Sequence, residues 1–284
     1  LVDEGLLLMV KNGLGNFYRP EFNFNNIERW DVSEGYLIKM DGEGELRLRG
    51  ITVMPDEPID LVDGWQMISY YPRNPVDAVT ALSGIVENLI LAKDGAGRFY
   101  NVEFGFSNMG DMVEGNGYQL KLDGDTQLVY TFEEELANIP ESSQSDYAQP
   151  CVLPTHSITS QNMSLLVKAD DHLTGEIGVY AAGELVGSGR LEKGSAGIAV
   201  WGDDISTEEI DGAISGQALD IMLINETGQH KLDYDVLAGN RIYTTDSFLA
   251  IGISNSQLTP EEFGIYSAFP NPFNSTTLIN YGLP

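Results

Sequence analysis

An internal repeat in the first half of the chain is the strongest constraint on its fold. Residues 7–48 align with residues 89–130 at a constant shift of 82 positions and without a gap, and 16 of the 42 aligned residues are identical. Self-similarity of this kind is typical of a duplicated structural unit. The identical pairs include Lys11 and Lys93, Gly13 and Gly95, Phe17 and Phe99, Tyr18 and Tyr100, Gly35 and Gly117, and Tyr36 and Tyr118.

The pattern within the repeated unit predicts short strands joined by tight turns. Leu89–Lys93 is an apolar strand candidate, and the Asp94-Gly95 pair after it is a hairpin signal. Residues 117–122 alternate between polar and apolar side chains and lead into a second Asp-Gly pair at 123–124. We therefore expect a small, mainly β module.

The second copy is longer at its N-terminal end than the first. We call its additional N-terminal residues, 51–88, the front part. This part contains the strand candidate Gly64–Ser69 and a predicted helix, with Asn74 as N-cap and Pro75 at its first position. Its predicted apolar face consists of Ala78, Val79, Leu82 and Val86. Residue 1 already aligns with residue 83, so we expect residues 1–50 to be a truncated module whose core is incomplete and leans on a neighbour. On this interpretation the chain is a fragment, and its true N-terminus lies upstream.

A third structural region is predicted after a linker. Residues 133–150 are polar and contain two prolines, as is typical of linkers. Seven short strand candidates follow within about a hundred residues, which favours an antiparallel β-sandwich. The strand candidates are 164–169, 176–182, 184–191, 197–201, 219–225, 231–236 and 247–253.

The predicted fold class is therefore mainly β, with tandem small β-rich modules followed by an antiparallel β-sandwich. One short helix is expected in the complete copy. The expected domains are a truncated module (1–50), a complete module (51–132), a linker (133–150), a sandwich (151–255), and a linker with the start of a C-terminal domain (256–284).

The charge balance excludes several classes of partner. The chain has 15 basic and 43 acidic side chains and a net charge of −28. A surface this negative repels phosphate backbones and anionic lipids, so we expect no nucleic-acid binding.

No apolar stretch approaches the ~20 residues of a transmembrane helix. The single cysteine, Cys151, excludes an internal disulfide.

The most specific motif lies at the C-terminal end. Residues 268–284 read AFPNPFNSTTLINYGLP. They resemble the opening of the C-terminal sorting domain of type IX secretion, which begins with the pattern Y/F-PNPFNP-x-T-x-I-x-Y-x-L-P. Ser275 stands where that family usually has proline. The resemblance implies a bacterial protein that the type IX secretion machinery exports to the outer cell surface or the extracellular space.

The repeats are also similar to modules found in large secreted proteins with such tails. Those modules pair a G-W-N-x-I-S strand with later K-[DN]-G-x-G-x-x-Y and G-Y-x-x-K stretches. The counterparts here are Gly64–Ser69, residues 93–100 and residues 117–121, with Gln66 in place of asparagine. The third region is similar to another accessory β module through WGDD at 201–204 and DG at 211–212. These resemblances imply an architecture rather than an activity.

The sequence contains no recognisable catalytic constellation. His156, His172 and His230 are not at metal-ligand spacing from one another. The nucleophile-elbow, Walker and dinucleotide-binding patterns are absent. The glycine-rich stretches 187–189 and 194–197 are interpreted as turns. We therefore predict that the chain is not an enzyme.

The best candidate for a ligand site is the acidic loop 203–212. Ca²⁺ prefers six to eight oxygen ligands from a flexible loop. Asp203, Asp204 and Asp211 are the candidate calcium ligands, although their spacing differs from that of an EF-hand. The alternative is a metal-free turn with a capping box between Ser206 and Glu209.

Three functions compete on the sequence alone. The first is a non-catalytic structural or adhesive region of a large exported protein. The second is a carbohydrate-binding accessory region of a secreted hydrolase whose catalytic domain lies upstream, because Trp30, Trp65 and Trp201 can stack on sugars. An enzyme within these residues is the least favoured. The expected partners are the type IX secretion machinery, extracellular polysaccharide or other surface proteins.

Overall fold

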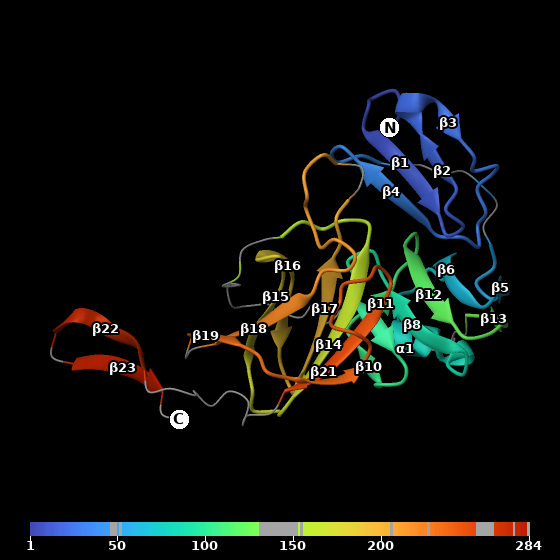
Figure 1. Cartoon of the computed structure of the whole chain (residues 1–284). Coiled ribbons are helices and arrows are strands. Elements are labelled where there is room, and N and C mark those ends of the chain that lie inside the picture. The colour runs from blue at the N-terminus through green and yellow to red at the C-terminus, as the bar shows by residue number, and fades with distance from the viewer. Residues whose placement is uncertain are drawn as a thin grey trace. The chain divides into compact units, whose positions relative to one another are not determined.

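A computed structural model of the chain describes residues 1–45, 50, 53–130, 153, 156–204, 207–225, 228–253, 264–274 and 276–282 (Figure 1). For the last two ranges only the backbone is described. The chain divides into two compact units, Leu1–Ser142 and Ser143–Pro284. As predicted, the fold is mainly β, and the described residues contain a single short α-helix.

The first unit begins with a four-stranded sheet, which we call the first module (residues 1–45). Its strand order is β3-β2-β1-β4, and β4 is an end strand of the sheet (Figure 1). The strands are β1 (Leu7–Asn12), β2 (Phe17–Arg19), β3 (Phe24–Asn25) and β4 (Tyr36–Met40), with a 3-10 turn, η1 (Pro20–Phe22), between β2 and β3.

The second module (residues 53–130) contains a five-stranded sheet of order β10-β9-β8-β12-β6 and two small two-stranded pairs. Strand β5 pairs with β13, and β7 pairs with β11. The sheet consists of β6 (Gly64–Ser69), β8 (Leu89–Lys93), β9 (Phe99–Asn101), β10 (Phe106–Ser107) and β12 (Gly117–Leu122). The small pairs consist of β5 (Ile59–Leu61), β7 (Val76–Asp77), β11 (Asp111–Met112) and β13 (Thr126–Leu128).

The two sheets share one pairing pattern, displaced by 82 residues. Val10 is opposite Tyr18 in the first sheet, and Ala92 is opposite Tyr100 in the second. The break in register between Leu7 and Met9 recurs between Leu89 and Leu91. Because both strand order and register agree, the sequence repeat corresponds to one repeated sheet topology.

The helix differs from its prediction in both cap and face. Helix α1 (Ala78–Ala81) begins after Asp77, whose carboxylate accepts hydrogen bonds from the Val79 and Thr80 amides. The predicted cap at Asn74 and Pro75 is wrong, because Val76 and Asp77 pair as strand β7 with β11 and keep the chain extended.

A 3-10 turn, η2 (Ser83–Ile85), follows α1 and tightens the helical period. The buried positions are therefore Ala78, Ala81, Leu82 and Ile85, whereas Val79 and Val86 are exposed. The four buried residues belong to an apolar core that also includes Ile59, Leu61, Ile68, Tyr70, Leu89, Tyr100, Met112, Tyr118, Leu120, Leu128 and Tyr130.

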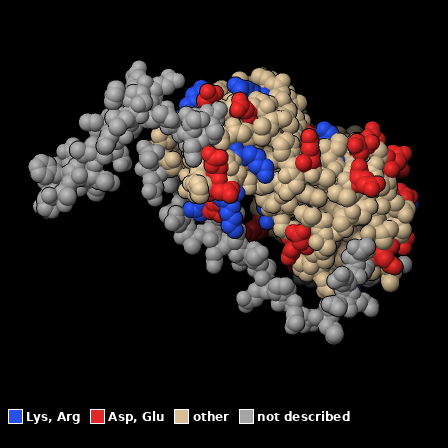
Figure 2. All heavy atoms as spheres, turned by 90° about the horizontal axis from the view of Figure 1, so that it is seen from below, with Lys and Arg blue, Asp and Glu red and all other residues tan. Residues whose placement is uncertain are grey.

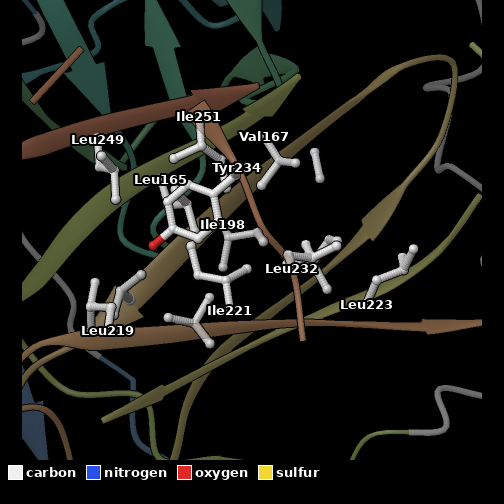
Figure 3. Packing of buried hydrophobic residues seen from close by; sticks show 14 of the residues in the cluster. Leu165, Val167, Ile198, Leu219, Ile221, Leu223, Leu232, Tyr234, Leu249 and Ile251 are labelled. Carbon is white, nitrogen blue, oxygen red and sulfur yellow. The ribbon is translucent and has the colours of Figure 1, made fainter. Parts of the chain in front are cut away.

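The second unit contains the predicted β-sandwich. Two four-stranded sheets of order β17-β14-β21-β20 and β16-β15-β18-β19 enclose one core (Figure 3). The strands are β14 (Asn162–Ala169), β15 (Gly175–Ala181), β16 (Glu184–Leu191), β17 (Ser195–Trp201), β18 (Leu219–Asn225), β19 (Gly228–Lys231), β20 (Asp235–Ala238) and β21 (Phe248–Ile253).

Two details of the predicted sandwich are corrected. Strands β14 and β21 pair in parallel, so the sandwich is not wholly antiparallel. The predicted strand 231–236 is two strands, because β19 and β20 belong to different sheets. Leu232 and Tyr234 lie between them and are buried in the shared core, where the chain crosses from one sheet to the other (Figure 3).

The C-terminal segment forms a hairpin of β22 (Gly264–Asn274) and β23 (Thr276–Gly282). Residues 268–274 and 276–282, part of the segment predicted to be a sorting signal, lie on this hairpin, and the register shifts between Phe269 and Asn274, where the PNPF residues lie. No helix among the described residues is both long and apolar enough to cross a membrane.

Candidate functional site

The acidic loop predicted to bind calcium is closed at its base by backbone contacts. Gly202 and Ala213 form an isolated parallel bridge. The Asp203 amide donates to the Ala213 carbonyl at 3.0 Å, and the Ala213 amide donates to the Trp201 carbonyl at 2.9 Å. The loop is therefore a closed excursion from the end of β17.

Two of the three candidate metal ligands accept hydrogen bonds from this loop's own backbone. Asp211 Oδ1 accepts from the Asp204 amide at 2.9 Å, and Asp203 Oδ1 accepts from the Asp211 amide at 3.0 Å. The Thr207 hydroxyl and amide both donate to the Asp204 carbonyl. These bonds give the carboxylates a structural role in the loop. Ser206, half of the alternative capping box, lies outside the described residues.

The glycines of this loop are required by close packing. A Cβ atom on Gly202 would lie 2.0 Å from the Tyr243 hydroxyl oxygen, and one on Gly212 would lie 2.3 Å from the Gly202 carbonyl carbon. The glycines of the WGDD and DG pattern therefore allow two backbone segments to contact each other closely at the base of the loop. Within the described ranges, no three His, Cys, Asp or Glu side chains gather closely enough to hold a metal ion. Calcium binding by Asp203, Asp204 and Asp211 stays a prediction.

The three tryptophans that could form a sugar platform lie in different surroundings. Trp201 is only 3% exposed. The Trp65 ring has the ammonium groups of Lys93 and Lys121 at 4.7 and 5.8 Å from its centre, within cation–π range. Trp30 is 49% exposed and packs edge-on against Tyr36 at 4.2 Å. The structure therefore places these rings on separate elements.

Aromatic residues of the second module form a buried tyrosine cluster. The Tyr70 and Tyr130 rings lie 5.0 Å apart, and Tyr118 is 6.5 Å from Tyr70. The Tyr130 hydroxyl donates to the Ser69 carbonyl, and the Tyr118 hydroxyl oxygen accepts from the Val113 amide, both at 2.8 Å. Burial raises the pKa of all three tyrosines above the ordinary value of 10.0.

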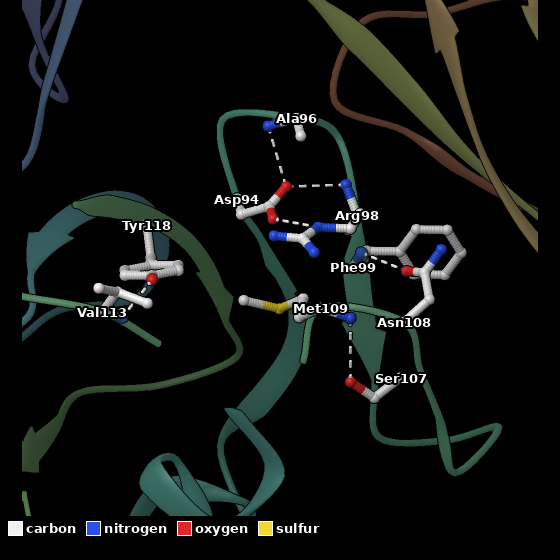
Figure 4. A network of polar contacts seen from close by, with 9 residues as sticks. All are labelled: Asp94, Ala96, Arg98, Phe99, Ser107, Asn108, Met109, Val113 and Tyr118. Atoms are coloured by element: carbon white, nitrogen blue, oxygen red, sulfur yellow. Dashed lines mark hydrogen bonds and ion pairs between the residues drawn. The ribbon is translucent and has the colours of Figure 1, made fainter. Parts of the chain in front are cut away.

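The predicted Asp94-Gly95 turn is fixed by the aspartate side chain (Figure 4). Asp94 Oδ1 accepts from the Ala96 and Arg98 amides, and Asp94 Oδ2 accepts from Arg98 Nε at 2.7 Å. In the first module Asn12 occupies the same position and accepts from the Leu14 and Asn16 amides. Asp and Asn both supply the side-chain oxygen that accepts these amide bonds, which explains why the two repeats have Asn12 and Asp94 at this position.

The glycine-rich stretch 187–189 is a strand rather than the predicted turn. It lies within β16, where a Cβ on Gly187 would approach the Ala199 carbonyl oxygen to 2.6 Å and one on Gly189 would approach Ile198 to 2.7 Å. The two glycines thus let β16 pack closely on β17 across the sandwich. The stretch 194–197 is a turn only at Gly194, because β17 begins at Ser195.

Ser188, between these glycines, makes a contact that the sequence analysis missed. Its hydroxyl lies 3.0 Å from His156 Nε2. Near it, the Leu153 amide donates to Glu176 on β15. His156 and Ser188 are 32 positions apart in the sequence, and no pattern between them predicts this pairing.

The two modules of the first unit are joined by main-chain hydrogen bonds along β6. The Gly35 amide donates to the Met67 carbonyl, and the Ser69 amide donates to the Ser33 carbonyl, both at 3.1 Å. The Ser69 hydroxyl also donates to the Val32 carbonyl. A Cβ on Gly35 would lie 2.7 Å from the Ile68 carbonyl oxygen, so the joint requires glycine there.

Comparison of the chain with models of known protein families, with curated proteins and with solved structures found no match.

Proposed function

We propose that this chain is a non-catalytic structural or adhesive region of an exported bacterial surface protein. The observation that carries the proposal is the joint between the modules, in which residues 33–35 add to the edge of β6 by backbone hydrogen bonds. The pairing uses mainly backbone groups, which every repeated unit carries, together with the space left by Gly35. Such a joint suits a region that extends a protein from module to module.

The surface charge supports the same proposal. Acidic groups outnumber basic groups on the face shown in Figure 2, and the chain as a whole carries a net charge of −28. A strongly negative surface favours solubility and repels similar chains. It therefore suits a protein displayed at high density on a cell surface.

Export by type IX secretion is supported by the sequence motif at 268–284. The test deletes residues 269–284 from the gene in its native host and locates the product by cell fractionation and surface labelling. A deletion of the same length within the predicted linker, residues 133–148, is the matched control. We expect the first variant to be retained in the periplasm and the control to reach the surface. Normal surface display of both variants would contradict the proposal.

Carbohydrate binding is the second candidate function, and exposed aromatic side chains of the first module favour it. Phe22, Phe24 and Trp30 are 63%, 43% and 49% exposed. A glycan array probed with the chain and with its Trp30→Ala variant separates the two functions. Glycan binding that the substitution abolishes would support the second function, and turnover of glycans, esters or peptides would contradict the non-catalytic proposal.

A further inference from the structure

The front part of the second module, residues 57–88, completes that module in three places. Strand β6 pairs with β12, β7 pairs with β11, and β5 pairs with β13. The helical turns α1 and η2 add Ala78, Leu82 and Ile85 to the core. Three later strands of the repeat, β11, β12 and β13, therefore pair with this part, and its helical turns cover the core face of the sheet.

The first module has the later elements without their partners. Residues 29–30 and 44–45, the counterparts of β11 and of the start of β13, are not strands. Strand β4, the counterpart of β12, is the end strand of its sheet (Figure 1). The residues that bond β6 of the second module, 33–35, precede β4. In the described residues, the outer edge of β4 therefore carries no strand.

Side chains at the counterpart core positions are apolar, yet several are open to solvent. Trp30 is 49% exposed where Met112 is 0%, and Ile38 is 40% exposed where Leu120 is 0%. Tyr36, Met40 and Ile27 are partly exposed, whereas their counterparts Tyr118, Leu122 and Met109 are buried. The first module thus has the side chains of a core without the layer that covers it.

We propose that this face, together with the outer edge of β4, binds a strand–helix segment of the same pattern as residues 57–88, supplied by a neighbouring module of the same kind. The segment would add a β6-like strand to β4 and lay its helical turns over Trp30 and Ile38. A second copy of this chain is a poor source, because its own residues 57–88 are already paired within its second module.

The lysines of the first module support the same occupant. In the second module, Trp65 of β6 lies against Lys93 and Lys121. Their counterparts are Lys11 and Lys39, at the same shift of 82. A tryptophan in the incoming strand would lie over these two lysines. The edge of β4 and the apolar face explain the exposure of Trp30 without a sugar ligand.

The test inserts a second copy of residues 57–88 directly before Leu7, in place of residues 1–6, and keeps the chain to residue 284. Amide hydrogen exchange by mass spectrometry follows Tyr36–Met40. We expect exchange there to slow by about tenfold or more, because unpaired edge amides exchange by local opening. Strand β14 serves as an internal measure that the sandwich remains folded.

The matched control carries Ile68→Asp in the inserted copy only, which buries a charge in the new core. We expect it to restore the exchange rate of the parent chain. Equal exchange in the parent, the chimaera and the control would overturn the proposal. So would a parent chain that is a dimer by light scattering with Tyr36–Met40 already protected, since a second copy would then be the occupant.

Discussion

The hydroxyl of Tyr130 donates a 2.8 Å hydrogen bond to the backbone carbonyl of Ser69, 61 residues away in the sequence. This bond joins the end of the second module to β6, the strand on which the first module also docks. Removing the hydroxyl leaves the ring packing in place but leaves a carbonyl without this donor.

Tyr130→Phe tests that bond. We expect the free energy of unfolding of the first unit to fall by about 1–2 kcal/mol, as for a lost buried hydrogen bond. Urea unfolding of the full chain, followed by hydrogen exchange in β6 and in β14, assigns the loss to a unit. A loss confined to β14 would contradict the assignment.

Alkaline pH should destabilise the second module through its buried tyrosines. Burial raises the pKa of Tyr70, Tyr118 and Tyr130 above the value of 10.0 expected when they are exposed. As the pH rises, the unfolded chain therefore releases these protons before the folded chain does. The contribution of these tyrosines to the free energy of unfolding is fully present below pH 10 and falls as the pH rises above it. Each group contributes about 1.4 kcal/mol per pH unit until its folded pKa is reached.

The measurement is urea unfolding between pH 9 and pH 11, with tyrosinate absorbance recorded in parallel. Tyr130→Phe should reduce the slope of stability against pH. An unchanged slope would show that Tyr130 titrates alike in the folded and unfolded states.

The structural and the metal-binding role of the acidic loop predict different effects of a calcium chelator on stability. Because Asp211 Oδ1 accepts the Asp204 amide, Asp211→Ala should destabilise the sandwich by about 1–3 kcal/mol. Asp211→Asn keeps an acceptor oxygen and should cost less. We expect a calcium chelator to leave the melting temperature of the full chain unchanged.

A fall in melting temperature with chelator, abolished by Asp204→Ala, would instead establish the calcium site. Binding to the native state stabilises by about 2.7 kcal/mol at a hundredfold excess over Kd, which thermal unfolding detects readily.

Gly187→Ala should destabilise the sandwich although it adds a single methyl group. The new Cβ would lie 2.6 Å from the Ala199 carbonyl oxygen, so β16 and β17 must separate. Overpacking of this kind costs about 1–3 kcal/mol. Ser188→Ala, next to it on the same strand, is the control and should cost about 1 kcal/mol or less, because it removes one partly exposed hydrogen bond to His156. Equal costs would contradict the packing role of Gly187.

Local sequence patterns correctly predicted those strands and turns whose conformation depends on residues close together in the sequence. The alternation in 117–122, the Asp94-Gly95 turn and the strand 219–225 appear in the structure as predicted, because side-chain period and turn chemistry act over a few residues. The helix cap was mispredicted because pairing of β7 with β11, more than thirty residues later, overrides the signal at Asn74 and Pro75.

The sequence by itself determined that the chain is mainly β and that residues 7–48 repeat as 89–130, because both follow from periodicity and self-similarity. Only the tertiary structure decided which side chains of the repeat are buried. Trp30 and Met112 hold equivalent positions, but within the described residues only Met112 has a paired strand and shares a core with a helix. Burial depends on segments far away in the chain, and a residue's own neighbours in sequence do not contain that information.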